Sequence, residues 1–211
     1  MRLYDYAASG NCYKARLLLA LLDQPYERVA VDIFAGDTLT DDFAAVNPAR
    51  ETPVLVLDDG TAIVQSNAII WYLGEGTPLL PMSRVQRARA MQWLLFEMEY
   101  IVRGVAAARF WKLTGRGDPQ TIAARVDHGR SGLALLNDHL RQSDYLVDSL
   151  SIADIAVFAY THVAADAGIA LDDYPHVHAW CQRIAKHPRF IDDFITYPAN
   201  ARPGAGHSIY D

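Results

Sequence analysis

Two short stretches of the chain place polar side chains at the expected start of a helix, where a helix can bind an anion. Ser66 opens an apolar helical stretch, and its hydroxyl and the free N–H groups of the first turn form a site for a carboxylate. Gln65, directly before it, can add a side-chain hydrogen bond. Ser9 also precedes a helical stretch, which begins at Asn11. Taken alone, either serine is more often a plain helix cap or turn residue than a binding group.

Pro53 is the third residue that can do chemistry, because it stands directly before the apolar run 54–57. A proline at this place either begins an edge strand or forms a cis peptide bond that exposes the Thr52 backbone to a peptide-like ligand. Only about 5% of X-Pro bonds are cis. The residues alone therefore favour the edge-strand interpretation.

The elements that would position these residues alternate between strands and helices over the first 80 residues. Asp59-Gly60 supplies the turn of a hairpin. The order βαβαββα predicts an α/β layer. The expected strands are 2–6, 26–31, 54–57 and 61–64, and the expected helices are 11–22, 41–46 and 66–73.

After residue 84 the sequence shows helical periods and no convincing strand. The stretch 152–163 is apolar on nearly every side, which predicts a buried helix, and Ser151 with Asp154 forms a capping box before it. Glycines and prolines are frequent between the two halves of the chain, which is typical of a linker. We therefore expect one domain at 1–76, a linker at 77–84 and an all-helical domain at 85–211.

Two ordered motifs together resemble the cytosolic glutathione S-transferase family. Asn47-Pro48, Pro53, the strand after it, Asp58-Asp59-Gly60 and the run 65–73 (QSNAIIWYL) follow in the order of the family's glutathione-binding half. The run 9–16 (SGNCYKAR) resembles the Ser-x-x-x-x-Arg/Lys-x-Arg active-site motif of its serine-type classes, with a bacterial-like character. With the helical half included, the resemblance covers essentially the whole chain. It implies a thioredoxin-like first domain and a helical second domain that shapes a second pocket.

The resemblance also implies the roles of particular residues. Ser9 is the expected catalytic residue, and its hydroxyl donates a hydrogen bond to the sulfur of glutathione, the co-substrate. Such a bond, together with the helix N-terminus, lowers the pKa of a thiol from its ordinary value of about 8.5 and makes a better nucleophile. The residues expected to bind glutathione are Asn11, Thr52, Pro53, Gln65 and Ser66.

Cys12 has the second position of a Cys-x-x-Cys spacing in which Ser9 stands first. The second position is usually the more buried one, so we interpret Cys12 as structural, with glutathionylation as the alternative. The second-substrate pocket has candidates by position only, and for any single aromatic residue the core is the more common place. These candidates are Tyr6, Tyr100, Arg103, Phe110 and Trp111.

The sequence departs from the family pattern at the site for the glycyl end of glutathione. Many members have a lysine where Glu51 stands and a polar or basic residue near Thr38 and Leu39. Glu51 can repel a carboxylate, and Arg50 beside it can compensate. Two classes of function therefore stay open: a glutathione transferase acting on a small electrophile, or a binding module of the same fold without catalysis. Within the first class, conjugation for detoxification, peroxide reduction, isomerisation and dehalogenation are alternatives.

Composition and charge argue against several classes of partner and location. The net charge of −6 and the absence of a Lys/Arg cluster argue against a nucleic-acid partner. The sequence has no run of about 18 apolar residues, so it predicts no membrane span. No cluster of histidine, cysteine or carboxylate residues has metal-ligand spacing. The chain opens with a strand pattern and not a signal peptide, so we expect a cytoplasmic protein. From the spacing of possible ligands we expect no metal. The resemblance also implies a homodimer.

Overall fold

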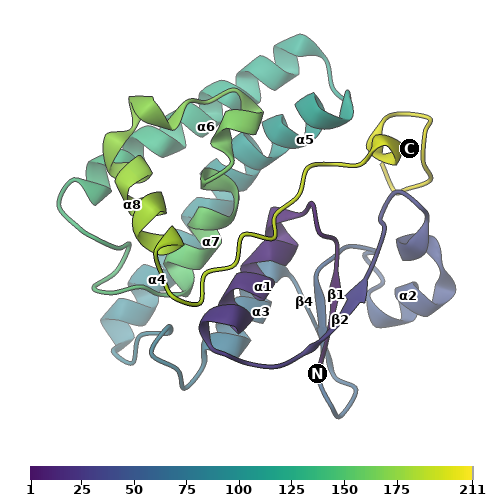
Figure 1. Ribbon diagram of the computed structural model, residues 1–211, viewed down its shortest axis with the longest axis horizontal. Coiled ribbons are helices and arrows are strands. Elements are labelled where there is room, and N and C mark those ends of the chain that lie inside the picture. The colour runs from purple at the N-terminus through teal and green to yellow at the C-terminus, as the bar shows by residue number, and fades with distance from the viewer. Residues whose placement is uncertain (211) are drawn as a thin grey trace. The chain divides into compact units, whose positions relative to one another are not determined.

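The computed structural model describes residues 1–210, which form two compact units (Figure 1). The first unit contains residues 1–73 together with the C-terminal residues 191–210, and the second contains Gly74–Phe190. The sequence predicts that the C-terminal residues belong to a helical domain 85–211, and the structure instead groups them with the first unit. The predicted linker 77–84 belongs to the second unit, where Leu80 is buried.

A four-stranded sheet in the order β2-β1-β3-β4 forms the base of the first unit. Strand β1 is parallel to β2 and antiparallel to β3, and Leu3 pairs with Arg28 on one side and with Leu55 on the other. This mixed sheet and its helices confirm the predicted order βαβαββα and the thioredoxin-like class. The elements are β1 (Arg2–Asp5), α1 (Gly10–Leu21), β2 (Glu27–Ala30), α2 (Asp41–Val46), β3 (Val54–Val56), β4 (Ala62–Val64) and α3 (Ser66–Gly74), with a 3₁₀ turn at Asp37–Leu39.

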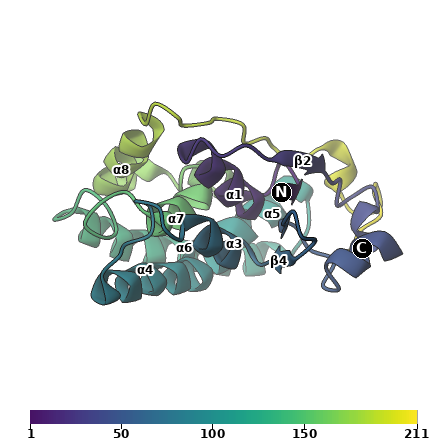
Figure 2. The same ribbon diagram turned by 90° about the horizontal axis from the view of Figure 1, so that it is seen from below.

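Helix α1 is the most deeply buried element of this unit. Leu17, Leu18 and Leu19 are all fully buried, although on an isolated amphipathic helix three consecutive residues would not share one face. Helix α1 is therefore covered on more than one side, partly by residues 191–194 of the C-terminal segment, which Figure 2 shows passing along it. Such a helix presents its N-terminus, and thus Ser9, on a rigid support.

The described residues of the second unit contain helices and loops and no strand, as predicted for an all-helical domain. Its helices are α4 (Arg84–Phe96), a π-helical segment (Glu97–Ala106), α5 (Ala107–Thr114), α6 (Pro119–Leu140), α7 (Ile152–Thr161) and α8 (Pro175–Ala185), with 3₁₀ turns at Ala164–Ala167 and Leu171–Asp173. Every residue of α7 is buried, which confirms the expected buried helix.

The capping box before α7 is also confirmed, and it reaches further than the sequence predicts. The Ser151 hydroxyl accepts the Ala153 N–H at 3.2 Å, and Asp154 accepts the Ser151 N–H at 3.0 Å. Asp154 also accepts the Leu146 N–H and the Trp180 indole N–H, both at 3.0 Å. Burial raises the pKa of Asp154 to about 6. A single carboxyl thus joins α7, α8 and the chain before them.

Glycines allow the π-helical segment and α6 to approach closely. A Cβ on Gly104 would lie 2.5 Å from the Gly129 backbone, and a Cβ on Gly132 would lie 2.5 Å from the Cβ of Tyr100. Helix α4 runs directly into the π-helical segment, and the rings of Trp93 on α4 and His139 on α6 are 4.7 Å apart. The lack of side chains on these glycines sets the separation of the two longest helical runs in the unit.

We expect Gly104→Ala to lower the free energy of unfolding by about 2 kcal/mol or more, because its Cβ would meet backbone atoms that cannot rotate away. The matched control is Ala134→Val, which adds volume at an exposed position of α6 and should cost less than about 1 kcal/mol. Denaturant unfolding followed by circular dichroism measures both. Equal losses for the two variants would contradict the close-contact interpretation.

Candidate functional site

Ser9 caps helix α1 with its side chain. Its backbone is extended, and its Oγ accepts the Cys12 N–H at 3.4 Å. The Ser9 N–H donates to the Tyr6 carbonyl at 3.0 Å, which closes the turn after β1. A hydroxyl that accepts one hydrogen bond can still donate another. Because Ser9 is only partly buried, the role of helix cap and the role of donor to a ligand are compatible at this position.

The Cys12 thiol is unsuited to be a nucleophile. It is fully buried and its sulfur accepts the Tyr6 N–H at 3.3 Å. Burial raises the pKa of this thiol to about 11, although hydrogen bonds from Thr52, Tyr6 and Ser9 act in the opposite direction. The thiol is therefore neutral near pH 7, which supports the interpretation of Cys12 as structural. The contact with Thr52 also brings the segment before β3 to the first turn of α1.

The peptide bond between Thr52 and Pro53 is cis, as the motif indicates, and pairing of the Thr52 backbone with a ligand stays a prediction. Helix α3 starts with Ser66, the residue expected to open it, and the residue before it, Gln65, has a φ of +70°. A left-handed backbone is uncommon for a residue other than glycine. Here it turns the chain sharply from β4 into the helix and leaves the Gln65 side chain exposed.

Lys14 is a site residue that the sequence analysis does not single out. Its side chain is fully buried, and Nζ donates to Ser66 Oγ at 3.1 Å and to Asn67 Oδ1 at 3.2 Å. The Ser66 hydroxyl in turn donates to Asn11 Oδ1 at 3.3 Å. These bonds bring Asn11 and Ser66 together and place an ammonium at the N-terminus of α3. The signal was present as the basic position of the 9–16 motif.

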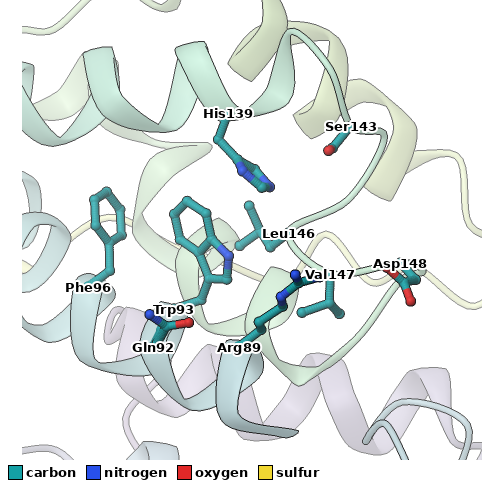
Figure 3. A pocket seen from close by; sticks show the side chains of 9 residues that line it. All are labelled: Arg89, Gln92, Trp93, Phe96, His139, Ser143, Leu146, Val147 and Asp148. Carbon is teal, nitrogen blue, oxygen red and sulfur yellow. The ribbon is translucent and has the colours of Figure 1, made fainter. Parts of the chain in front are cut away.

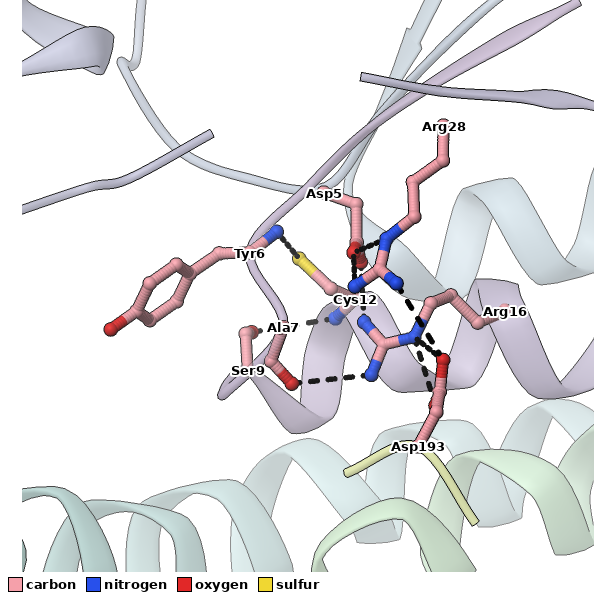
Figure 4. A network of polar contacts seen from close by, with 8 residues as sticks. All are labelled: Asp5, Tyr6, Ala7, Ser9, Cys12, Arg16, Arg28 and Asp193. Atoms are coloured by element: carbon pink, nitrogen blue, oxygen red, sulfur yellow. Dashed lines mark hydrogen bonds and ion pairs between the residues drawn. The ribbon is translucent and has the colours of Figure 1, made fainter. Parts of the chain in front are cut away.

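A network of buried charges holds the loop before α1 (Figure 4). Arg16 and Asp5 are fully buried and form an ion pair, and Arg16 also donates to the Ala7 carbonyl at 3.2 Å. Arg16 Nε lies 2.9 Å from an oxygen of Asp193 in the C-terminal segment, and Arg28 of β2 pairs with the other oxygen of Asp5. Burial alone would lower the pKa of Arg16, but the carboxylates of Asp5 and Asp193 raise it.

Comparison with known proteins gives a consistent result over the two halves of the chain. The family profile "Glutathione S-transferase, N-terminal domain" matches residues 8–75, and "Glutathione S-transferase, C-terminal domain" matches residues 119–183. A glutathione S-transferase of Pseudomonas fluorescens Pf-5 is 41% identical in sequence and has a similar structure with a TM-score of 0.89. The match covers 92% of this chain and 98% of that one.

The chain belongs to the glutathione S-transferase family. A maleylacetoacetate isomerase of Pseudomonas aeruginosa is 27% identical over 209 residues, which are 95% of this chain and 97% of the relative. A glutathione transferase of Burkholderia graminis, solved with two glutathione molecules bound per subunit, is 26% identical with a TM-score of 0.77. That match covers 89% of this chain and 84% of the other.

In this member of the family, Arg50 places a cation beside the loop at Thr38. Its guanidinium donates to the carbonyls of Thr38 and Thr40, each at 3.0 Å. It thus lies beside Leu39, where many family members have a polar or basic side chain. Glu51 is exposed, and its carbonyl accepts the Asn47 amide at 2.8 Å.

Tyr6 is part of an aromatic cluster with the C-terminal segment. Its ring lies 6.0 Å from Phe34 and 6.3 Å from Tyr197, and Phe34 also contacts Tyr210 at 6.1 Å. The His207 N–H donates to the Phe34 carbonyl at 2.8 Å, which fixes the end of the segment. Figure 4 shows the Tyr6 ring pointing away from Cys12. Tyr6 is 5% exposed, so it packs as a core residue of the first unit.

The other candidates for the second pocket lie in the second unit. Tyr100 stacks on His128 at 5.2 Å, and Arg103 pairs with Glu99 at 3.0 Å. The remaining two aromatic candidates lie on α5 and have arginines over their rings. Arg116 lies over Phe110 at 5.9 Å and Arg125 lies over Trp111 at 5.6 Å. Their position relative to Ser9, which belongs to the other unit, stays a prediction.

Two further observations concern metal ions and membranes. Within residues 1–210, no group of three or more histidine, cysteine or acidic side chains is arranged to hold a metal ion. No helix in the same part of the chain has the length and apolar character needed to span a membrane.

Arg16→Met should lower the free energy of unfolding by about 3 kcal/mol or more, because it removes the buried partner of the buried Asp5. Asp193→Asn is the matched control: it leaves the Arg16–Asp5 pair intact, and the Asp193 side chain is 36% exposed. That variant should cost about 1 kcal/mol or less. Denaturant unfolding of the first unit, followed by hydrogen exchange in β1 and α1, measures both. A loss below 1 kcal/mol for Arg16→Met would disprove the importance of the buried pair.

Proposed function

We propose that this chain is a glutathione transferase in which Ser9 activates the glutathione thiol. One observation carries the proposal: at the first turn of α1, Ser9 is an accessible donor, whereas the Cys12 thiol is buried with a raised pKa. The reacting sulfur must then come from a ligand. A hydrogen bond from Ser9 to that sulfur stabilises the thiolate and lowers its pKa. The gain is a stronger nucleophile at neutral pH, held in position.

The start of α3 supports recognition of a carboxylate, such as the one at the γ-glutamyl end of glutathione. The free N–H groups of its first turn and the Lys14 ammonium provide positive charge in a region with little water. Gln65 is exposed directly before this turn and can add a hydrogen bond. Lys14 is buried behind Ser66, so we assign it a positioning and electrostatic role and not direct contact with the ligand.

Thr52 and Pro53 complete the proposed glutathione site. A peptide-like ligand can pair with the Thr52 backbone, and the contact of Thr52 with Cys12 holds this segment beside α1. The Arg50 guanidinium supports binding of the glycyl carboxylate and counteracts Glu51. In this proposal Asn11 acts through its hydrogen bond with Ser66.

The second substrate is a small electrophile, and Tyr100, Arg103, Phe110 and Trp111 remain the proposed pocket residues. Isomerisation is the second candidate reaction, because the isomerase of Pseudomonas aeruginosa is similar over nearly the full length of both chains. The two reactions share the activated thiolate and differ in whether glutathione leaves again. We also propose a cytoplasmic location, since both cysteines are free and buried.

Ser9→Ala is expected to leave glutathione binding within about threefold of wild type and to raise the pKa of the bound thiol by one to two units. Conjugation of 1-chloro-2,4-dinitrobenzene near pH 7 should fall by about 10- to 100-fold. Calorimetry measures binding, and thiolate absorbance as a function of pH measures the pKa. If the bound thiol has the same pKa in both proteins, Ser9 does not activate it.

Two other variants separate binding from activation. Lys14→Met should weaken glutathione binding by about tenfold while the pKa of bound thiol stays lowered. Cys12→Ala should retain both properties, because the Cys12 sulfur is buried. If the wild type does not bind glutathione at millimolar concentration, the transferase proposal is wrong. Conjugation lost in Cys12→Ala and kept in Ser9→Ala would move the chemistry to Cys12.

We also propose that the chain forms a homodimer through an apolar surface of α4 and the start of the π-helical segment. Met91, Leu95 and Met98 are exposed at helical spacing, and Leu135 of α6 is exposed as well. Leu95→Glu should shift sedimentation from dimer to monomer at micromolar concentration. Met82→Glu is the control, because Met82 is more exposed but lies outside helix α4. A wild-type protein that sediments as a monomer would refute the proposal.

A further inference from the structure

The second unit contains a pocket of about 500 Å³ that the proposed glutathione reaction does not use. It lies between α4, the end of α6 and the loop after α6, and its volume is typical of small-molecule sites. Helix α4 contributes Arg89, Gln92, Trp93 and Phe96, which share one face at helical spacing. Figure 3 shows His139 reaching from the opposite helix towards Trp93.

The pocket walls offer hydrogen-bonding groups that no protein group uses. Within residues 1–210, the Arg89 guanidinium makes no ion pair or hydrogen bond, and the Trp93 indole N–H has no acceptor. The Nε2 atom of His139 is buried and also lacks a partner there. Figure 3 shows Arg89, Trp93 and His139 directed towards the same space. Buried polar atoms are normally paired, so an unpaired one that lines a pocket indicates a missing ligand or water.

The rest of the lining suits a flat aromatic group. The Trp93 ring has Phe96 at 4.9 Å and His139 at 4.7 Å, and both approach it at steep angles of 73° and 59°. One part of its surface therefore remains for a further ring. The buried side chains of Leu146 and Val147 provide an apolar wall. Aromatic rings gain from such edge and offset contacts in addition to their buried area.

The charges at the pocket favour an anionic group near Arg89. Arg89 is the one basic side chain with a permanent charge in the lining, and Asp148 is the one acidic side chain. Asp148 already accepts a hydrogen bond from the Gln86 amide and lies on the side of the pocket away from Phe96 (Figure 3). A carboxylate that binds at Arg89 and the indole N–H would gain a charge-assisted hydrogen bond. A cation would have only the partly satisfied Asp148.

We propose that this pocket binds a small planar aromatic carboxylate. The ring lies against Trp93 and the apolar wall of Leu146 and Val147. The carboxylate accepts hydrogen bonds from Arg89 and from the Trp93 indole. His139 Nε2 donates to the carboxylate or accepts from a ring substituent. The site is separate from the glutathione site in its residues, so it does not depend on the proposed transferase activity.

The test uses 2-naphthoate as the probe and the neutral 2-naphthalenemethanol as its isostere, titrated into the full-length protein by calorimetry with saturating glutathione present. We expect naphthoate to bind at least tenfold more tightly than the alcohol. Arg89→Gln should remove this difference by weakening naphthoate alone about tenfold. Arg84→Gln is the matched control, because Arg84 is also exposed on α4 and lies outside the pocket. It should bind both probes like wild type.

A second readout places the probe in the pocket. Chemical-shift changes on naphthoate addition should occur at the Trp93 indole N–H and the His139 ring, and Trp93→Phe should weaken binding while circular dichroism confirms folding. Equal affinity for acid and alcohol, or no binding at millimolar naphthoate, would overturn the proposal. So would shift changes confined to the first unit. A change of Arg89→Gln from dimer to monomer with no effect on naphthoate would show that a second copy of the chain covers the pocket, which also overturns it.

Discussion

The buried ion pair of Arg16 and Asp5 is the interaction on which the arrangement of the first unit depends. Two fully buried charges are tolerated only as partners with further hydrogen bonds. Here one guanidinium satisfies the end of β1, the Ala7 carbonyl in the loop before Ser9, and Asp193 in the C-terminal segment. The entry to α1 therefore has one geometry. A movement of the loop would leave a buried charge without its partner. Because this is unfavourable, the buried pair makes the loop rigid.

The fixed loop places Ser9 and Cys12, which are three residues apart in the sequence, in different surroundings. The turn leaves the Ser9 hydroxyl partly exposed at the helix N-terminus and directs the Cys12 sulfur to the Tyr6 N–H inside the unit. The raised pKa of Cys12 then makes its thiol a packing group. A protein that used its own thiol would need the opposite arrangement. The local chemistry therefore agrees with the family in which the sulfur is supplied by glutathione.

The features that the sequence predicts well are those with short-range causes. The order βαβαββα, the Ser151–Asp154 capping box and the buried α7 depend on residues close together in the chain. The cis bond at Pro53 needed the ordered motif, because the proline alone argued against it. The missed features join distant residues: Lys14 with Ser66 are 52 positions apart, and Arg16 with Asp193 are 177 apart. No spacing rule encodes such pairs. The positive φ of Gln65 has no sequence signal of its own. The pocket at Trp93 is formed by two helices that are distant in sequence.

The distribution of charge makes the proposed binding of an anion such as glutathione compatible with a net charge of −6. At physiological ionic strength, charges beyond about 8 Å are largely screened, so the surface carboxylates affect the rate of encounter more than the affinity. The affinity is decided by groups at the site. In the proposed site these are the buried Lys14 with the N-terminus of α3, and Arg50 beside the loop at Thr38. Buried charges are screened less than exposed ones. A few positive groups held by hydrogen bonds at the two ends of the ligand can therefore outweigh a negative surface.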